Sequence, residues 1–485
     1  MPEGSEAQLF GHPRGLTILF FTEMWERFSY YGMRSLLILF MTANLASGGL
    51  GLDTPTAAVI YGLFTAMVYL MALPGGWIAD RITGHRKAVL VGGILISLGD
   101  LVLALPGLGT FYGGLVLVVI GTGLLKPNVS TIVGQLYTPE DRRRDSGFSI
   151  FYMGINLGAF LSPFACGWAA AQYGWRAGFA LASVCMALGT FQYLSGSRTL
   201  GNAGVLPATP NDKAARQQFL IGTLLLTALI GLVFFLSVTG TVSPNGIVDA
   251  SGALLLLIVT VFFGWLLFGA KGSETDRKRL VVIFFLFLAA CVFWSVFEQA
   301  GSSLTLFAER NTDNKTPAFQ IQVPWYQSVQ PFFIITLAPV FGAIWLWLGR
   351  FEPSSPAKFA WGLIFVGIGF LILVGGASLA SAGVRVSPFW LVATYFFHTC
   401  GELCLSPVGL SAMTKLAPAR VAGLMMGVYF LSISVGNYVG GRLAAFYGTL
   451  PLPVLFGAVG LFAVAAGLLL ALFVKPMVRL MAGVK

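Results

Sequence analysis

The chain has 485 residues, of which 56% are hydrophobic and only 10% are charged. Soluble domains carry about 25% charged residues, so this composition excludes an ordinary water-soluble globular protein. The formal net charge of +10 does not indicate nucleic-acid binding, because the basic residues stand in short segments between apolar runs. The 60 glycines and 41 phenylalanines suit close helix–helix contacts and lipid-facing aromatic rings. We therefore predict an all-α protein of the lipid bilayer.

Fourteen apolar segments are long enough to cross a bilayer, for which a helix needs about 20 residues. In chain order they begin near Leu16, Thr56, Ala88, Phe111, Ser146, Trp175, Phe219, Ser251, Leu280, Trp325, Ala357, Pro388, Arg420 and Pro451. The polar stretch from Ser195 to Gln218 reads as a cytosolic linker, and the two segments after it contain no internal charge. We expect a six-helix bundle over residues 1–194, a linker with an inserted two-helix hairpin over 195–279, and a second six-helix bundle over 280–485.

The placement of Lys and Arg predicts how these helices are oriented. Most of the 29 basic residues fall in alternate loops and in the two tails, as Arg142, Arg143 and Arg144 do. Loops with this bias face the cytosol, so we expect both termini there and a multi-pass protein of the cell membrane. We also expect a monomer.

No enzyme motif and no metal site are visible. The five cysteines all lie in apolar segments, and none stands in a cluster with histidine, so no metal ion or cofactor is predicted. His-Glu-x-x-His, Gly-x-Ser-x-Gly and a phosphate-binding loop are absent from the sequence. We do not expect an enzyme.

A basic loop joins the second and third segments. It contains Gly76, Asp80, Arg81, Gly84, Arg86 and Lys87, in the sequence GWIADRITGHRK. The glycines permit a tight turn, and Asp80 is expected to pair with a loop arginine or to cap a helix. The motif resembles the cytosolic loop of the major facilitator superfamily, which implies two six-helix bundles and says nothing about the substrate.

The first segment carries an unusual set of polar side chains for a membrane helix. They stand three or four positions apart and so share one face: Glu23, Glu26, Arg27, Tyr30, Tyr31 and Arg34. Charges inside a membrane are costly unless they pair or face a wet cavity. A plain salt bridge near the cytosolic mouth would also account for Glu23, but Arg34 lies too deep for that explanation.

This face resembles the first-helix motif of the proton-dependent oligopeptide transporters, a family of the major facilitator superfamily. Further similar blocks run through both halves of the chain: GTGLLKPNVS around Lys126, FYMGINLG around Asn156, FWSVFEQ with Trp294 and Glu298, and GELCLSP with Glu402 and Ser406. The two extra helices, without a large outer domain, are similar to the bacterial branch of that family.

The resemblance implies a proton-coupled importer of di- and tripeptides that works by alternating access. It assigns the peptide carboxylate to Arg27, Arg34 and Lys126, the amino end to Asn156 and Glu298, and the pocket walls to Tyr30, Tyr31, Tyr69 and Trp294. Gln330, Glu402, Ser406 and Tyr429 complete the predicted peptide site. Gln330 stands where the family usually has Asn and Tyr429 where it usually has Trp, so peptide length and side-chain preference stay open.

Proton coupling is expected at Glu23, Glu26, Arg27, Glu298 and Glu402, because a carboxylate in the membrane needs a cation or a proton to neutralise it. Matching depths along their helices predict two gating pairs, Arg34 with Glu298 on the outer side and Lys126 with Glu402 on the inner side.

Two alternatives remain, a same-fold transporter of another anion such as nitrate and a peptide receptor that moves no cargo. Glu298 favours an amine-bearing substrate over an inorganic anion. Prolines beside pocket residues, such as Pro127 and Pro407, favour helices that move. Outside the motifs, Asp100 is expected to form an interhelical hydrogen bond. His398 is expected to pack in the core, although it stands one turn from Glu402.

Overall fold

The computed structural model describes residues 8–9, 11–138, 140–207, 213–241, 243–269, 273–317, 319–418, 421 and 424–483. Two short strands, β1 (Gln8–Leu9) and β2 (His12–Pro13), pair antiparallel ahead of the first helix. The helices are α1 (Arg14–Thr42), α2 (Thr54–Leu70), α3 (Ala72–Ile78), α4 (His85–Leu103), α5 (Leu108–Gln135), α6 (Arg144–Tyr173), α7 (Trp175–Gly196), α8 (Lys213–Val238), α9 (Pro244–Gly264), α10 (Glu274–Phe297), α11 (Ser303–Arg310), α12 (Val329–Leu348), α13 (Ser355–Ser381), α14 (Phe389–Leu416), α15 (Met425–Ala444) and α16 (Leu452–Leu480).

Each of the fourteen predicted segments coincides with a helical region, so the all-α prediction is confirmed. In the described part of the chain, nine regions are long and apolar enough to cross a membrane by length and composition. Helix α1 is not among them, because it carries Glu23, Glu26, Arg27 and Arg34 within its length. The helix expected near Arg420 begins at Met425, and Arg420 itself lies outside the described residues.

The seventh predicted helix begins earlier than expected and is interrupted before its end. Helix α10 begins at Glu274 rather than near Leu280, because Ser273 and Asp276 cap each other's backbone N–H groups in a capping box. At its other end α10 gives way to the 3₁₀ turn η5 (Glu298–Gly301) before α11 continues. The predicted seventh helix is therefore interrupted at Glu298.

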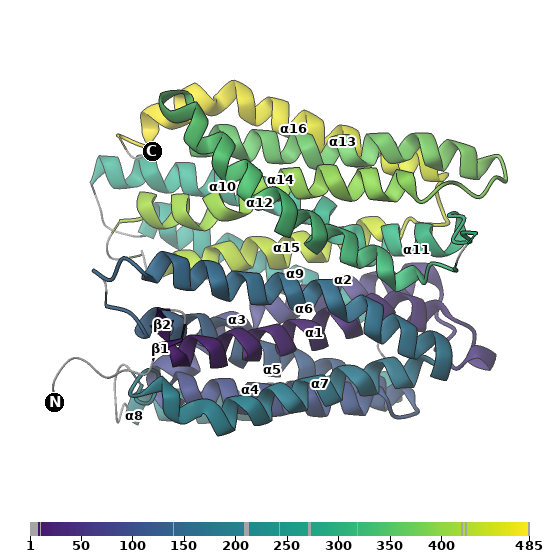
Figure 1. The fold of residues 1–485 in the computed structure, drawn as a ribbon, viewed down its shortest axis with the longest axis horizontal. Coiled ribbons are helices and arrows are strands. Elements are labelled where there is room, and N and C mark those ends of the chain that lie inside the picture. Colours follow the sequence, from purple (N-terminus) through teal and green to yellow (C-terminus); the bar gives the residue numbers. More distant parts are fainter. Residues whose placement is uncertain are drawn as a thin grey trace. The chain divides into compact units, whose positions relative to one another are not determined.

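The helices form two compact units. Unit 1 falls within Met1–Leu50 and Met67–Ile247, and unit 2 within Gly51–Ala66 and Val248–Lys485. In unit 1, α1 packs against α6 and α7, and α4 packs against α5 (Figure 1). A Cβ on Gly158 would collide with the backbone oxygen of Met24, so this glycine lets α6 lie directly against α1. That contact positions the charged face of α1.

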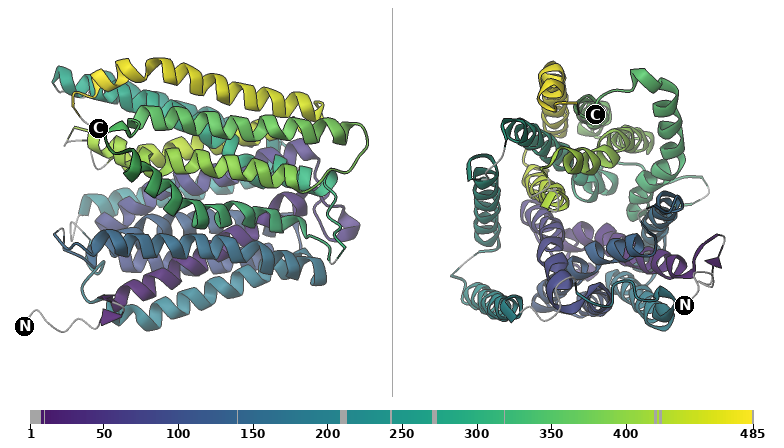
Figure 2. Two further views of the ribbon diagram at one scale, coloured as in Figure 1. Left: turned by 45° about the horizontal axis from the view of Figure 1, so that its top comes forward. Right: turned by 90° about the vertical axis from the view of Figure 1, so that its left-hand side faces the viewer.

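In unit 2, α13 packs against both α14 and α16, and α10 packs against α15. Helices α13 and α16 lie side by side along their lengths in Figures 1 and 2. A Cβ on Gly367 would come within 2.7 Å of the Gly460 backbone oxygen, and the reverse distance is 2.9 Å. The paired glycines therefore set the close spacing of these two helices.

The polar stretch after α7 is partly bound to the rest of unit 1. Helix α7 extends to Gly196, and the 3₁₀ turn η3 (Ser197–Leu200) follows it. The backbone N–H of Arg86 donates to the Gly204 oxygen at 2.9 Å, and the Arg86 Nε donates to the Ala203 oxygen at 2.6 Å. The start of this stretch is thus held against the start of α4, so it is not a free tether.

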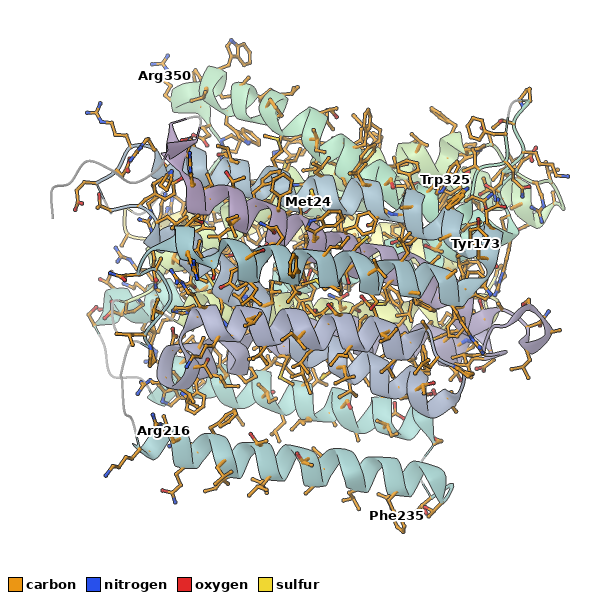
Figure 3. All side chains as sticks on the ribbon, turned by 60° about the horizontal axis from the view of Figure 1, so that its bottom comes forward. Met24, Tyr173, Arg216, Phe235, Trp325 and Arg350 are labelled. Atoms are coloured by element: carbon orange, nitrogen blue, oxygen red, sulfur yellow. The ribbon has the colours of Figure 1, made fainter. Side chains whose placement is uncertain are left out.

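The two inserted helices differ in their contacts. Most described side chains of α8 are exposed, and Figure 3 shows Arg216 and Phe235 towards its two ends. Helix α9 is anchored to α15, where the Arg442 guanidinium pairs with Asp249 and the Tyr438 hydroxyl donates to the Val248 oxygen at 3.3 Å. The predicted domain boundaries, 1–194, 195–279 and 280–485, stay a prediction.

Candidate functional site

The charged face of α1 forms a buried ion cluster in unit 1. Arg27 is 2% exposed and Glu26 is fully buried. The Arg27 Nε lies 3.2 Å from Glu23 Oε1, and it also donates to Glu26. One oxygen of each carboxylate and one guanidinium nitrogen have no hydrogen-bond partner among the described residues. Two carboxylates thus share one guanidinium, with polar atoms left over for a proton or a ligand.

Aromatic rings hold the cations of this unit in place. Arg27 lies over the Tyr30 ring at 5.3 Å, and Arg34 lies over the Tyr31 ring at 5.6 Å. Lys126, which sits beside Pro127 inside α5, has its Nζ 3.9 Å from the centre of the Tyr69 ring. Cation–π contacts of this kind fix the direction of a cation without neutralising its charge. The rings therefore orient these three cations.

Lys126 also lies within electrostatic range of Glu23. The structure thus brings the predicted residues of α1, α2 and α5 together in unit 1. Asn156 is buried as well, and its amide donates to the Tyr152 oxygen of its own helix at 3.0 Å. Its predicted role at the amino end of a peptide stays a prediction.

Asp100 makes the interhelical hydrogen bond that was expected of it. This fully buried residue of α4 accepts a hydrogen bond from the Ser29 hydroxyl of α1. Ser29 was missed by sequence reasoning, although it stands three positions after Glu26, a spacing that places neighbouring side chains on one side of a helix. The bond ties α4 to α1 close to the ion cluster.

In unit 2, Glu298 stands at the break between α10 and α11. It is 6% exposed and opens the 3₁₀ turn, and Trp294 one turn earlier is 5% exposed. The Trp294 ring packs edge-on against Phe293 and Phe297. Irregular backbone at membrane depth is tolerated where it is buried in protein or lines a water-filled cavity. The break is therefore consistent with a functional position for Glu298.

Two further hydrogen bonds join predicted site residues of unit 2. Gln330 Nε2 donates to Glu402 Oε2 at 2.6 Å, which links α12 to α14. The Tyr429 hydroxyl donates to Ser406 Oγ at 3.1 Å, which links α15 to α14. Both residues that depart from the family pattern, Gln330 and Tyr429, thus contact other predicted site residues.

His398 packs in the core of unit 2. It is fully buried, with its ring 5.3 Å from Phe370 and 6.0 Å from Phe297 between centroids. The histidine therefore fills space between aromatic side chains, as expected.

The basic loop between α3 and α4 brings Asp80 close to a histidine. Asp80 Oδ1 lies 3.5 Å from His85 Nε2, and His85 Nδ1 donates to Asn128 Oδ1 at 2.9 Å. The N-cap of α4 is Gly84, which has a φ of 74° and no side chain to cap the helix, so Asp80 does not cap α4. The Asn128 amide in turn donates to the Gly75 oxygen at 3.2 Å.

Polar contacts thus run from the exposed Asp80 through the buried His85 to the buried Asn128 of α5. Sequence reasoning missed His85 and Asn128. The only available signal was a histidine between Gly84 and Arg86 in an otherwise basic run.

The two predicted gating pairs each combine one residue of unit 1 with one of unit 2. Arg34 with Glu298, and Lys126 with Glu402, therefore stay predictions. Within its own unit, Glu402 accepts the hydrogen bond from Gln330 and pairs with no described lysine or arginine. A carboxylate in that state can take a proton or a cation.

Comparison with known proteins identifies the family. The model of the POT family matches residues 86–454. The chain is 41% identical to the Peptide transporter YePEPT of Yersinia enterocolitica subsp. palearctica serotype O:3 (strain YE-P4), over 97% of this chain and 96% of that protein. It is 36% identical to the Di-/tripeptide transporter of Lactococcus lactis subsp. cremoris, over 99% of each.

A solved structure agrees with these sequence matches. The crystal structure of a peptide transporter POT in complex with sulfate superposes with a TM-score of 0.94 at 41% identity, over 99% of this chain and 98% of that chain. The family predicted from the motifs is confirmed. The family model, the structural match and the helices long enough to span a bilayer lead to the same conclusion. The chain belongs to the POT family of membrane transporters.

Proposed function

We propose that this protein imports di- and tripeptides together with protons, by alternating access across the cell membrane. The observation that carries the proposal is the buried cluster in which Glu23 and Glu26 share Arg27. Relatives named as peptide and di-/tripeptide transporters, each matching nearly the whole chain, support the substrate class.

The cluster suggests how peptide binding and proton binding are linked. Arg27 compensates one of its two carboxylates, and Lys126 lies within electrostatic range of Glu23. Of Glu23 and Glu26, one carboxylate is left without a full positive charge from Arg27, and Lys126 partly balances it. A peptide carboxylate that binds Lys126 weakens this balance. A buried carboxylate without a cation is costly, so a proton takes the cation's place. Peptide and proton then bind together because each makes the other's binding less costly.

The residues that the family resemblance assigns to the peptide suit a zwitterion. Arg27, Arg34 and Lys126 would take the peptide carboxylate, and Asn156 and Glu298 would take its amino end. A zwitterion needs both signs, whereas an inorganic anion such as nitrate would use only the cations. The aromatic rings of Tyr30, Tyr31 and Tyr69 would offer the peptide's side chains an apolar wall without selecting one of them.

Orientation and surroundings form part of the same proposal. The excess of Lys and Arg in alternate loops supports cytosolic termini in a cell membrane that the helices cross many times. We propose a monomer as the working unit, because each chain carries both sets of charges.

Uptake of radiolabelled dialanine into proteoliposomes tests this function. An inward proton gradient should drive accumulation, and unlabelled dialanine trapped inside should drive counterflow without a gradient. Accumulation of nitrate but not of dialanine would replace the peptide with an inorganic anion. Binding of dialanine without either form of transport would indicate a receptor.

A further inference from the structure

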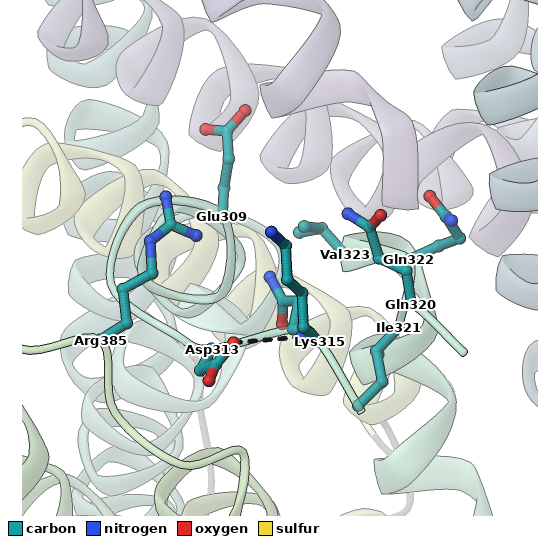
Figure 4. Close-up of a pocket in the computed structure, with 9 residues that line it drawn as sticks. Glu309, Asp313, Lys315, Gln320, Ile321, Gln322, Val323 and Arg385 are labelled. Carbon is teal, nitrogen blue, oxygen red and sulfur yellow. Dashed lines mark hydrogen bonds between the residues drawn. The ribbon is translucent and has the colours of Figure 1, made fainter. Parts of the chain in front are cut away.

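A cavity in unit 2 lies apart from the site residues described above. It occupies about 450 Å³ beside the end of α11, within the range of roughly 300–1,000 Å³ typical of small-molecule sites. Polar side chains dominate its lining, among them Glu309, Asp313, Lys315, Gln322 and Arg385 (Figure 4). A lining of this kind suits a polar ligand rather than a lipid tail.

Backbone hydrogen bonds hold the walls of this cavity. The Asp313 N–H donates to the Val386 oxygen at 2.8 Å, and the Val386 N–H donates to the Asn311 oxygen at 2.9 Å. These bonds join the segment after α11 to the turn between α13 and α14. On the other wall the Ile321 N–H donates to the Asn314 oxygen at 2.8 Å. The charged side chains therefore stand on a preformed frame, which lowers the entropy cost of binding.

The cavity contains charges of both signs that do not neutralise one another. Arg385 donates to the Thr312 carbonyl oxygen at 3.4 Å, and Asp313 accepts from the backbone N–H of Lys315 at 3.2 Å. In the described part of unit 2, no carboxylate pairs with the Lys315 ammonium or the Arg385 guanidinium, and no lysine or arginine pairs with Asp313.

Glu309 forms a half-exposed ion pair with its neighbour Arg310 at 3.5 Å. Ion pairs that water reaches contribute little stability, so the Glu309 carboxylate exchanges partners at low cost. In Figure 4 the charged ends of Lys315 and Arg385 project towards the same side as the Glu309 carboxylate.

We propose that this cavity captures zwitterionic peptides at the outer surface before they reach the transport site. Lys315 and Arg385 take the peptide carboxylate, Glu309 and Asp313 take its ammonium group, and Gln322 bonds the peptide group between them. Two positive and two negative side chains leave the cavity near neutral, so a neutral zwitterion is oriented without being repelled. The inference rests on the proposed function and on its orientation, which places this end of unit 2 outside the cell.

Initial rates of dialanine uptake into proteoliposomes test the capture step. Lys315→Gln combined with Arg385→Gln should raise the apparent KM about tenfold at low salt, with a smaller effect on the maximal rate, because the variant lacks the two cations that bind the peptide carboxylate before transport. The apparent KM of the wild type should rise with ionic strength, and that of the double variant should stay flat. Arg176→Gln, at an exposed arginine near the start of α7, is the matched control and should behave as the wild type.

A binding measurement tests the cavity without relying on transport. On a Glu298→Gln background, saturation-transfer NMR at low salt should still detect dialanine, and the signal should disappear when Lys315→Gln and Arg385→Gln are added. Dialanine amidated at its C-terminus should give a clearly weaker signal, since it lacks the carboxylate.

The outcomes separate the two proposals. If the wild type takes up no dialanine, the proposed function is wrong. If the wild type transports dialanine while the double variant keeps the wild-type KM, salt dependence and NMR signal, the capture site alone is wrong.

Discussion

The ion cluster of α1 predicts that one substitution separates peptide movement from proton coupling. In the Glu26→Gln variant, one carboxylate and one guanidinium remain in contact, and this pair is neutral without a proton. Counterflow requires only that the transporter binds the peptide and changes between its outward-facing and inward-facing states, so it should persist. Accumulation needs a proton that enters with each peptide, so it should be lost.

The size of the effect follows from the charge count in the cluster. Two carboxylates in contact with one guanidinium leave one excess negative charge, which one proton neutralises. With a gradient of one pH unit and 100 mV, one proton supplies about 3.7 kcal/mol, an accumulation of roughly 500-fold. The variant should equilibrate near an inside-to-outside ratio of about one, because no driving force is coupled to the peptide.

The assay compares steady-state accumulation and counterflow of labelled dialanine in the same proteoliposome preparation. Glu274→Gln is the matched control, because Glu274 forms an exposed salt bridge with Lys278 at the start of α10. Wild-type accumulation by the Glu26→Gln variant would refute the assignment of the proton to this pair. Loss of counterflow together with accumulation would instead assign Glu26 to peptide binding.

Three further predictions address the packing around the site and its gates. Gly158→Ala should cost about 1–3 kcal/mol of stability, measured as a lower unfolding temperature in detergent, whereas Gly222→Ala in an open part of α8 should not destabilise the protein. Asp100→Asn should keep both uptake and stability, because an amide oxygen still accepts the hydrogen bond from Ser29 of α1. Asp100→Leu cannot accept this bond and should lower the unfolding temperature. Equal stability of the two variants would contradict the role of the bond. Lys126→Ala and Glu402→Ala should lose uptake non-additively in a double-mutant cycle, and strictly additive losses would exclude this gating pair.

The sequence by itself determined the class of protein and much of its polar chemistry. A low charge content and fourteen apolar segments indicate a helical membrane protein, because backbone polar groups in lipid must be satisfied within each helix. Side chains three and four positions apart share a helical face, so the spacing of Glu23, Glu26 and Arg27 is enough to group them. These inferences depend on local geometry alone.

Only the tertiary structure decided which helices the polar side chains join. Asp100 pairs with Ser29 across 71 positions of sequence, and Gln330 pairs with Glu402 across 72. No periodicity within one helix reports such partners, since they depend on which faces of separate helices pack together. For the same reason the contact of Asp80 with His85 could not be predicted from the sequence.

The cavity beside α11 is the clearest case of an arrangement that the sequence could not predict. Three of its charges, Asp313, Lys315 and Arg385, come from two loops separated by two long helices, and in the sequence they resemble ordinary solvent-exposed loop residues. Backbone bonds between those loops, such as the bond from the Asp313 N–H to the Val386 oxygen, bring Lys315 and Arg385 to one cavity. Loop residues carry no repeating pattern, so their neighbours are set by the packing of the helices that support them.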